Sequence, residues 1–174
     1  VGGRGGKSGP SGSEAEQPKR LRLVIELVPR TCWGKNLRSK LPRRAWDDLR
    51  HQVYTGANHR CEVCGAEGRL NCHEKWEYDD KGRTQKLVGF VAVCNLCSAV
   101  THFGHATIRA AQGGLDLEEV ITHFMRVNKV ARQEFEEHFS AAWAMWKERS
   151  RHRWKTDLGR WEKVLNAKLT RKPS

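Results

Sequence analysis

The sequence predicts an α+β fold built around a small zinc-bound module that contains a β-hairpin and a helix. Four of the six cysteines form two Cys-x-x-Cys pairs. Between these pairs, residues 70–78 and 86–93 have the composition of strands, and the polar run 79–83 has the Asp/Gly chemistry of a hairpin turn. Apolar residues at helical spacing precede and follow this region, so we expect helices on both sides of it.

The two pairs, Cys61/Cys64 and Cys94/Cys97, predict a structural Zn²⁺ site. A Cys-x-x-Cys pair directs two thiolates at one centre, and two pairs supply the tetrahedral sulfur ligands that Zn²⁺ prefers. The alternative is a set of buried or disulfide-bonded cysteines, which the paired spacing and the strongly basic, non-secretory composition disfavour. Cys32 stands apart from the pairs, and we interpret it as a buried thiol.

The chain before the zinc module is predicted to have two parts. Residues 1–20 are basic and rich in Gly and Ser, which predicts a flexible tail. Such a tail is either an inert terminus or an arm that lies along phosphates. Residues 21–57 are expected to pack on the zinc module as a strand, residues 21–27, and a helix from Pro42 to about Tyr54.

The HNH-like zinc module itself is expected over residues 58–106. After the hairpin and the second cysteine pair, the run 95–103 contains no Gly or Pro and predicts a short helix that ends at Gly104. Zinc would then connect the start of the hairpin to the start of this helix.

The rest of the chain, residues 107–165, is predicted to be helical. Asp116 is the expected N-cap of one helix, and residues 132–152 carry aromatic side chains at helical spacing in a second one. We expect these two helices to form a hairpin that packs on the zinc module. Residues 166–174 are expected to fray.

The order of cysteine pair, hairpin, cysteine pair and helix resembles the HNH endonucleases, which are ββα-metal nucleases with a zinc-bound treble-clef scaffold. A looser resemblance over most of residues 22–162 is to a group of small bacterial proteins usually labelled HNH endonucleases, through the run 72–80 and the Trp-spaced C-terminal helices. The main resemblance covers about residues 58–106 and rests on Cys61, Cys64, His73, Cys94, Cys97 and His102.

The resemblance implies catalytic roles for two histidines. His73 matches the general base, which deprotonates the attacking water, and His102 is the other catalytic candidate. A second divalent ion, Mg²⁺, Mn²⁺, Ni²⁺ or Zn²⁺, would be held by His102 and Cys72. The family commonly has Asp where this chain has Cys72, and Asn or His where it has Ser98. We interpret Glu74 as a solvated strand residue.

The charge of the chain predicts a nucleic-acid partner. It has 32 Lys and Arg against 20 Asp and Glu, a formal charge of +12 and a pI of about 9.8. Such a surplus attracts polyanions, because phosphates neutralised by basic side chains release their counterions. We expect DNA rather than RNA, no membrane partner, and an intracellular location, either cytoplasmic or nucleoid-associated.

Two basic segments are the expected nucleic-acid contacts. Trp154 and Trp161 are interleaved with the second of them, which suits the stacking of exposed bases. The alternative is a solvated basic helix face whose tryptophans pack in the core. The basic residues are Arg38, Lys40, Arg43 and Arg44 in the first segment and Arg149, Arg151, Arg153 and Lys155 in the second.

Two functions are consistent with these patterns. The first is a metal-dependent HNH-type endonuclease that hydrolyses phosphodiester bonds in DNA. The alternative is a catalytically lapsed, zinc-bound nucleic-acid-binding module, for instance a subunit of a larger nucleoprotein assembly with protein partners of its own.

Overall fold

The computed structural model describes residues 20–163 and confirms the α+β class. This part of the chain contains five α-helices, one short 3₁₀ helix and a three-stranded sheet. The predicted tails, residues 1–20 and 166–174, lie outside the described residues apart from Arg20. None of the helices in the described range is both long and apolar enough to cross a bilayer.

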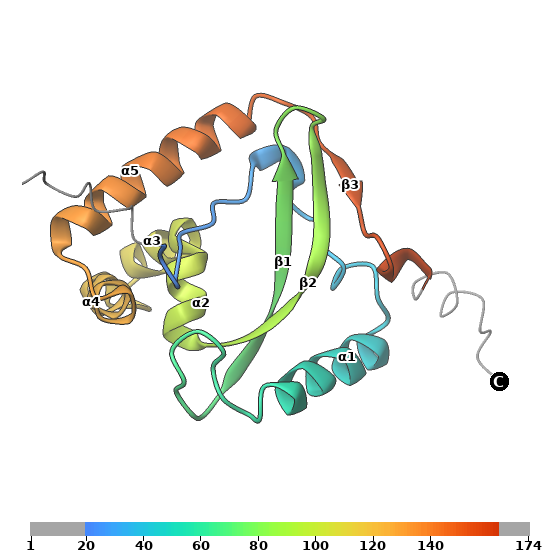
Figure 1. The fold of residues 1–174 in the computed structure, drawn as a ribbon, viewed down its shortest axis with the longest axis horizontal. Coiled ribbons are helices and arrows are strands. Elements are labelled where there is room, and N and C mark those ends of the chain that lie inside the picture. The colour runs from blue at the N-terminus through green and yellow to red at the C-terminus, as the bar shows by residue number, and fades with distance from the viewer. Residues whose placement is uncertain (1–19, 164–174) are drawn as a thin grey trace, which may run out of the picture.

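A hairpin of two long antiparallel strands runs through the middle of the molecule (Figure 1). The strands are β1 (Leu70–Asp79) and β2 (Thr84–Cys94), close to the predicted ranges. The turn between them has the expected chemistry: Asp79 Oδ1 accepts hydrogen bonds from the backbone N–H groups of Lys81 and Gly82, at 3.1 and 2.9 Å. A Cβ on residue 82 would lie 2.3 Å from Asp79 Oδ2, so another residue here would displace the carboxylate that closes the turn.

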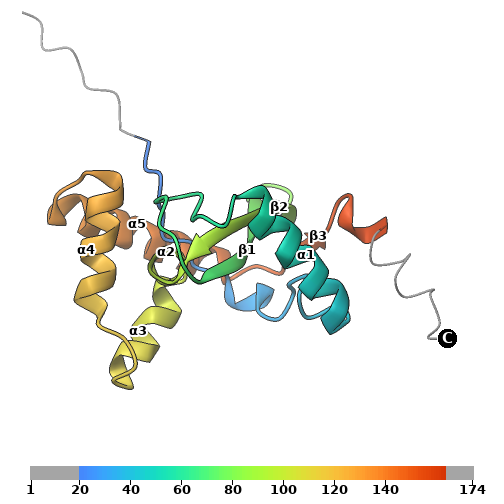
Figure 2. The same ribbon diagram turned by 90° about the horizontal axis from the view of Figure 1, so that it is seen from below.

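The helix α1 (Arg43–Gly56) packs against one face of the hairpin, and the other helices lie on the opposite side of it, with α5 running toward the hairpin turn (Figures 1 and 2). Trp46 of α1 contacts Phe90 of β2 edge-on, with ring centroids 6.2 Å apart. We call this buried cluster the α1 core. Its buried members are Leu37, Leu41, Ala45, Trp46, Leu87 and Leu158.

The short helix after the hairpin differs from the prediction at its end. Helix α2 (Asn95–Thr101) stops at His102, and a second helix, α3 (Phe103–Ala111), begins at once. The predicted stop at Gly104 is wrong, because Gly104 lies inside α3. A Cβ at residue 104 would lie 3.4 Å from Leu27 Cδ2, which is van der Waals contact, so this part of α3 packs against the N-terminal segment.

The predicted helical hairpin consists of α4 (Leu117–Asn128) and α5 (Arg132–Arg149). Asp116 caps α4 as expected, accepting hydrogen bonds from the N–H groups of Glu118 and Glu119. Helix α5 ends three residues before the predicted end at His152. These helices, α2 and the N-terminal segment share the larger buried cluster, the helical core. Its buried members are Leu23, Ile25, Cys61, Val93, Cys97, Val100, Phe103, Val120, Ile121, Phe124 and Phe135.

The segment 21–27 is extended but pairs with no strand in the described part of the chain, so the predicted strand is wrong. Side chains replace a neighbouring strand as its hydrogen-bond partners. Asn128 Oδ1 accepts from the N–H groups of Arg22 and Leu23, and Asn128 Nδ2 donates to Leu23 O. Further along, Ile25 N–H donates to His138 Nε2 at 2.9 Å. Glu26 N–H donates to the backbone oxygen of Thr101 in α2 at 2.9 Å, so these N–H groups find partners without a neighbouring strand.

The chain after α5 is not the basic helix that we expected. Instead, β3 (Lys155–Asp157) pairs in parallel with β2, with Lys155 opposite Thr84. Trp154 is only 4% exposed and donates its indole N–H to Arg149 O at 2.8 Å. This burial supports the alternative in which Trp154 packs in the core. A buried ring cannot stack on a base, so base stacking at Trp154 is excluded.

Replacing Asn128 with Ala should lower the free energy of unfolding by about 2–4 kcal/mol, because buried backbone groups of the N-terminal segment would lose their partners. Urea denaturation of the zinc-loaded protein measures this. The control is Asn71→Ala, which removes a more exposed side-chain hydrogen bond to Asn95 and should cost less than about 1 kcal/mol. Equal costs for the two variants would contradict the anchoring role of Asn128.

Candidate metal centre

The four paired cysteines converge as the sequence predicted. The Sγ atoms of Cys61, Cys64, Cys94 and Cys97 all lie within 4.8 Å of one another, and none of these cysteines is in a disulfide. The sulfurs of Cys64 and Cys94 are 3.7 Å apart. Tetrahedral Zn–S bonds of ~2.3 Å place sulfurs about 3.8 Å apart, so the cluster has the dimensions of a Cys₄ zinc site.

The local backbone conformation directs the two sulfurs of each pair toward the centre of the cluster. In the first pair, Gly65 N–H donates to Cys61 O at 2.8 Å, and Gly65 has a φ of +78°, a left-handed conformation that favours glycine. In the second pair, Cys94 is the N-cap of α2, and its Sγ accepts a hydrogen bond from Cys97 N–H at 3.4 Å. The first pair thus lies on a tight turn before the hairpin, and the second lies at the junction of β2 and α2.

The electrostatics of the cluster favour a bound cation. Burial tends to raise the pKa of Cys61, but backbone N–H groups of the surrounding turns offset this and lower its pKa to about 7. Burial raises the pKa of Cys97, and the neighbouring cysteines raise it further, because several thiolates repel one another. A divalent ion among the four sulfurs removes this repulsion, which is why such sites bind metal as thiolates.

Two residues that the sequence reasoning missed extend the cluster into α4. His123 is 3% exposed, and its Nε2 lies 3.1 Å from Cys97 Sγ. Its other nitrogen, Nδ1, lies 2.9 Å from Arg126 Nη2. A guanidinium group only donates, so Nδ1 accepts and Nε2 carries the proton that points at the sulfur. The spacing in the sequence could have predicted that His123 faces the core, because it follows the buried Val120 by three residues and so lies on the same face of the helix.

The two predicted catalytic histidines lie side by side next to this scaffold. The ring centroids of His73 and His102 are 4.7 Å apart. Burial lowers the pKa of His102 to about 4, with a further contribution from His73, so this imidazole is neutral near pH 7. Glu26, which the sequence reasoning did not consider, has its Oε2 3.7 Å from His73 Nε2. It comes from the extended N-terminal segment.

Cys72 lies on the other side of the hairpin from these histidines. His73 pairs with Val91, which packs on the helical core, whereas Cys72 packs against the α1 core. Burial, followed by the charge of Glu74, raises the pKa of Cys72 to about 12, so it is a neutral thiol. The structure therefore does not bring Cys72 together with His102. Among residues 20–163, no group of three or more metal-type ligands other than the four zinc cysteines is close enough to share an ion.

Glu74 is not the solvated strand residue that we expected. Its carboxylate accepts hydrogen bonds from the backbone N–H groups of Leu37 and Arg38, at 3.2 and 3.0 Å. Burial raises the pKa of Glu74, although these hydrogen bonds lower it. Its role is to fix the loop before α1 to the hairpin.

The basic residues predicted to contact nucleic acid differ in how exposed they are and in whether an acidic side chain already pairs with them. Arg149 is the least available, since it makes two hydrogen bonds to Asp80, at 2.8 and 2.6 Å, and its side chain is 17% exposed. It joins the end of α5 to the hairpin turn. Arg151 is exposed and forms an ion pair with Glu148. The remaining predicted residues are exposed: Arg38, Lys40, Arg43, Arg44, Arg153 and Lys155.

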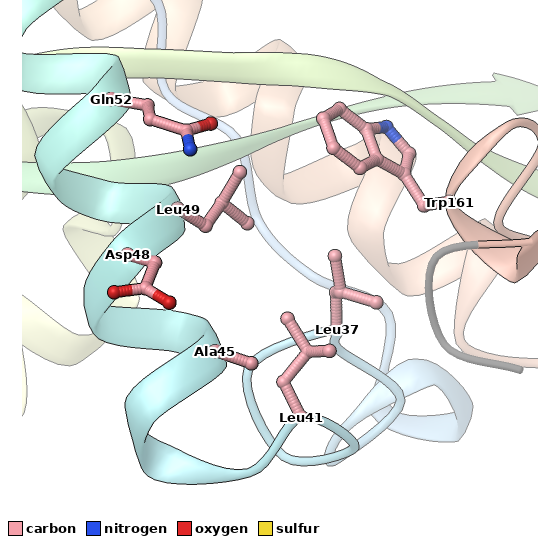
Figure 3. Close-up of a pocket in the computed structure, with 7 residues that line it drawn as sticks. All are labelled: Leu37, Leu41, Ala45, Asp48, Leu49, Gln52 and Trp161. Atoms are coloured by element: carbon pink, nitrogen blue, oxygen red, sulfur yellow. The ribbon is translucent and has the colours of Figure 1, made fainter. Parts of the chain in front are cut away.

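A pocket of about 260 Å³ lies between α1 and Trp161, on the α1 side of the hairpin (Figure 3). It contains no histidine or cysteine, and Trp161 packs on Phe90 with ring centroids 4.8 Å apart. The pocket is therefore separate from the metal centre and the histidine pair. Its lining residues are Leu37, Leu41, Ala45, Asp48, Leu49, Gln52 and Trp161.

In comparisons with known proteins, no family model, no curated protein and no solved structure matches this chain. The likeness to HNH endonucleases therefore remains a prediction from the motifs. The geometry on its own supports a four-cysteine site with the dimensions of a zinc centre and a partly buried pair of histidines in contact with each other.

We expect the purified protein to bind one Zn²⁺ per chain, and Cys64→Ser to lose it together with much of its thermal stability. The reason is that three thiolates hold zinc more weakly than four, and zinc binding contributes directly to folding. Metal analysis and thermal denaturation measure both effects. Cys32→Ser is the control, since Cys32 lies outside the cluster and should leave the zinc content unchanged. Full zinc occupancy in Cys64→Ser would exclude the Cys₄ site.

Replacing His123 with Ala should weaken zinc binding by about 10–100-fold, because Cys97 would lose the hydrogen bond to its sulfur. Competition with a chromophoric chelator measures the affinity. His51→Ala, at an exposed position on α1, is the control and should bind zinc as tightly as the unmodified protein. An unchanged affinity in His123→Ala would show that the contact to Cys97 does not act on the metal.

Proposed function

We propose that this protein is a metal-dependent endonuclease of the HNH type that hydrolyses phosphodiester bonds in DNA. The observation that carries the proposal is the contact between His73 and His102, with ring centroids 4.7 Å apart, beside a four-cysteine cluster. His73 matches the general base of the family that the motifs resemble, and His102 is the candidate partner that remains where Cys72 and Ser98 depart from the family pattern. The formal charge of +12 supports a polyanionic substrate.

In this proposal, His73 accepts a proton from a water molecule as the water attacks the scissile phosphorus. Glu26, with Oε2 3.7 Å from His73 Nε2, orients the imidazole and stabilises the charge that it acquires. His102 stays neutral near pH 7 because its pKa is lowered to about 4, which leaves its ring free to act as a ligand.

Imidazole and carboxylate ligands suit Mn²⁺, Ni²⁺ or Zn²⁺. His102 and Glu26 are the residues that would hold such an ion, in place of the Cys72 of the sequence prediction. A bound divalent ion would offset the negative charge that develops on the phosphate.

A second candidate function is a zinc-bound nucleic-acid-binding module without hydrolytic activity. The separation of Cys72 from the histidine pair favours it, because one of the two positions that commonly bind the catalytic metal in the family then has no role at the site. This module would bind nucleic acid with a steep salt dependence and would not need His73 for binding.

We expect the zinc-loaded protein to nick supercoiled plasmid in the presence of Mg²⁺, Mn²⁺ or Ni²⁺, and the rate to fall by about 10²–10⁴-fold in His73→Ala, which lacks the general base. Gel separation of supercoiled and nicked plasmid measures the rate. His102→Ala should lower it as well, through loss of a metal ligand.

The control for this experiment is His51→Ala, whose zinc content and rate should match those of the unmodified protein. Each variant is assayed for zinc, so that a lost scaffold is not mistaken for a lost base. Absence of nicking with all three ions would reject the nuclease in favour of the binding module. Equal nicking by His73→Ala would reject His73 as the base.

A further inference from the structure

Two tryptophans lie on the surface near the C-terminal end of α5. Trp33 is 67% exposed and Trp143 is 38% exposed. Exposed single aromatic residues are common, but these two belong to one ordered group with Trp146 and Arg30. We call this group the tryptophan surface. It lies where the 3₁₀ helix η1 (Arg30–Cys32) meets the last turns of α5 (Figure 1).

The rings of the tryptophan surface are held in place by specific contacts. The indole N–H groups of Trp33 and Trp146 both donate to the same carbonyl oxygen, that of Val28, at 3.0 Å each. Trp143 stacks on Trp146 with ring centroids 4.7 Å apart and an interplanar angle of 26°. Since the polar N–H of Trp33 is already satisfied, its exposed surface is mainly the apolar ring.

Basic residues are frequent in the two stretches that carry these rings. The Arg30 guanidinium lies 4.8 Å from the centre of the Trp146 ring, in the geometry of a cation–π contact. The two stretches that build the surface, residues 28–35 and 143–153, contain six basic residues and one acidic residue, Glu148. Glu148 is itself paired with Arg151 and His152. Arg149 is likewise paired with Asp80 of the hairpin turn, and the two stretches still carry an excess of basic residues.

We propose that the tryptophan surface binds single-stranded nucleic acid, with unpaired bases stacked on Trp33 and Trp143 and the phosphates held by the surrounding basic residues. Exposed aromatic rings within a positive surface are what a chain of bases and phosphates requires. A duplex keeps its bases stacked on one another and offers no free base face to these rings. The positive charge favours this ligand over an apolar protein partner, which would have to bury unpaired basic side chains.

This inference rests on the nucleic-acid partner of the proposed function but not on hydrolysis. It specifies the form of the ligand, and it also revises the position of base stacking from the buried Trp154 to Trp33 and Trp143. The experiment is therefore performed in a His73→Ala background, so that cleavage cannot remove the probe and a failed nuclease does not affect the result.

The test is fluorescence anisotropy of a short labelled oligo(dT), compared with a labelled duplex of the same length, without added divalent ions. Trp33→Ala and Trp143→Ala should each weaken oligo(dT) binding by about ten-fold, which is the usual loss for one base-stacking aromatic residue. Duplex binding should change by less than about two-fold, because phosphate contacts dominate it.

Two further variants separate stacking from folding. Trp33→Phe keeps an aromatic ring but lacks the N–H that bonds to Val28, so it should keep most of the oligo(dT) affinity if stacking is the cause. Ile108→Ala removes another exposed apolar side chain, 55% exposed on α3, and should bind as the parent does. Circular dichroism and zinc content confirm that each variant is folded.

Three results would overturn the proposal: no oligo(dT) binding by the parent, equal binding by the parent and the two alanine variants, or equal losses for oligo(dT) and duplex. Equal binding by all variants would assign the exposed rings to a protein contact instead. Nicking of plasmid by the unmodified protein is independent of each of these results, so the two proposals can fail separately.

Discussion

The rest of the structure depends on four sulfur atoms that must lie within 4.8 Å of one another. Two of these cysteines are buried and two are half-buried, and thiolates at this distance repel one another, which a divalent cation would offset. Zinc binding in small Cys-rich modules contributes about 10–16 kcal/mol, which is as large as the net stability of about 5–15 kcal/mol of an ordinary domain. The metal would fix the turn before β1 to the start of α2, and the helical core includes Cys61 and Cys97 among its buried members.

A series of polar contacts leads from this centre to the candidate catalytic residues. Helix α4 contacts the sulfur of Cys97 through His123 and holds the N-terminal segment through Asn128. Two residues beyond Leu23, the N–H of Ile25 is bonded to α5. The same segment brings Glu26 to His73. The backbone of Glu26 is held directly by α2, through Thr101 O, and its neighbours are held by α4 and α5, so these helices position the carboxylate beside the proposed base.

The features that could be predicted from the sequence have local causes. The cysteine pairs, the hairpin turn at Asp79 and the N-cap at Asp116 each depend on residues within a few positions of one another. The predictions that were wrong depend on contacts between residues that lie far apart in the sequence. The segment 21–27 takes hydrogen bonds from Asn128, 105 positions away from Leu23, and Gly104 lies in a helix that packs against Leu27. Cys72 follows the alternation of the strand into the α1 core, which could not be known before the packing of α1 was known.

The aromatic stripe of α5 shows how one sequence pattern can have two outcomes. Phe135 and Phe139 contact Phe103 of the helical core, as a packing stripe should. Helix α5 has 18 residues, a length of about 27 Å, and it continues beyond that core. Of its last aromatic residues, Trp146 is bonded to the loop that carries Val28 and is covered by Arg30, whereas Trp143 stays partly exposed. The apolar face of α5 continues past the core that buries its first part. At its end this face carries tryptophans, and basic residues follow them in the sequence. That composition is costly to leave in water and suits a stacked, negatively charged ligand, which is why we assign nucleic-acid contact to this end of the helix.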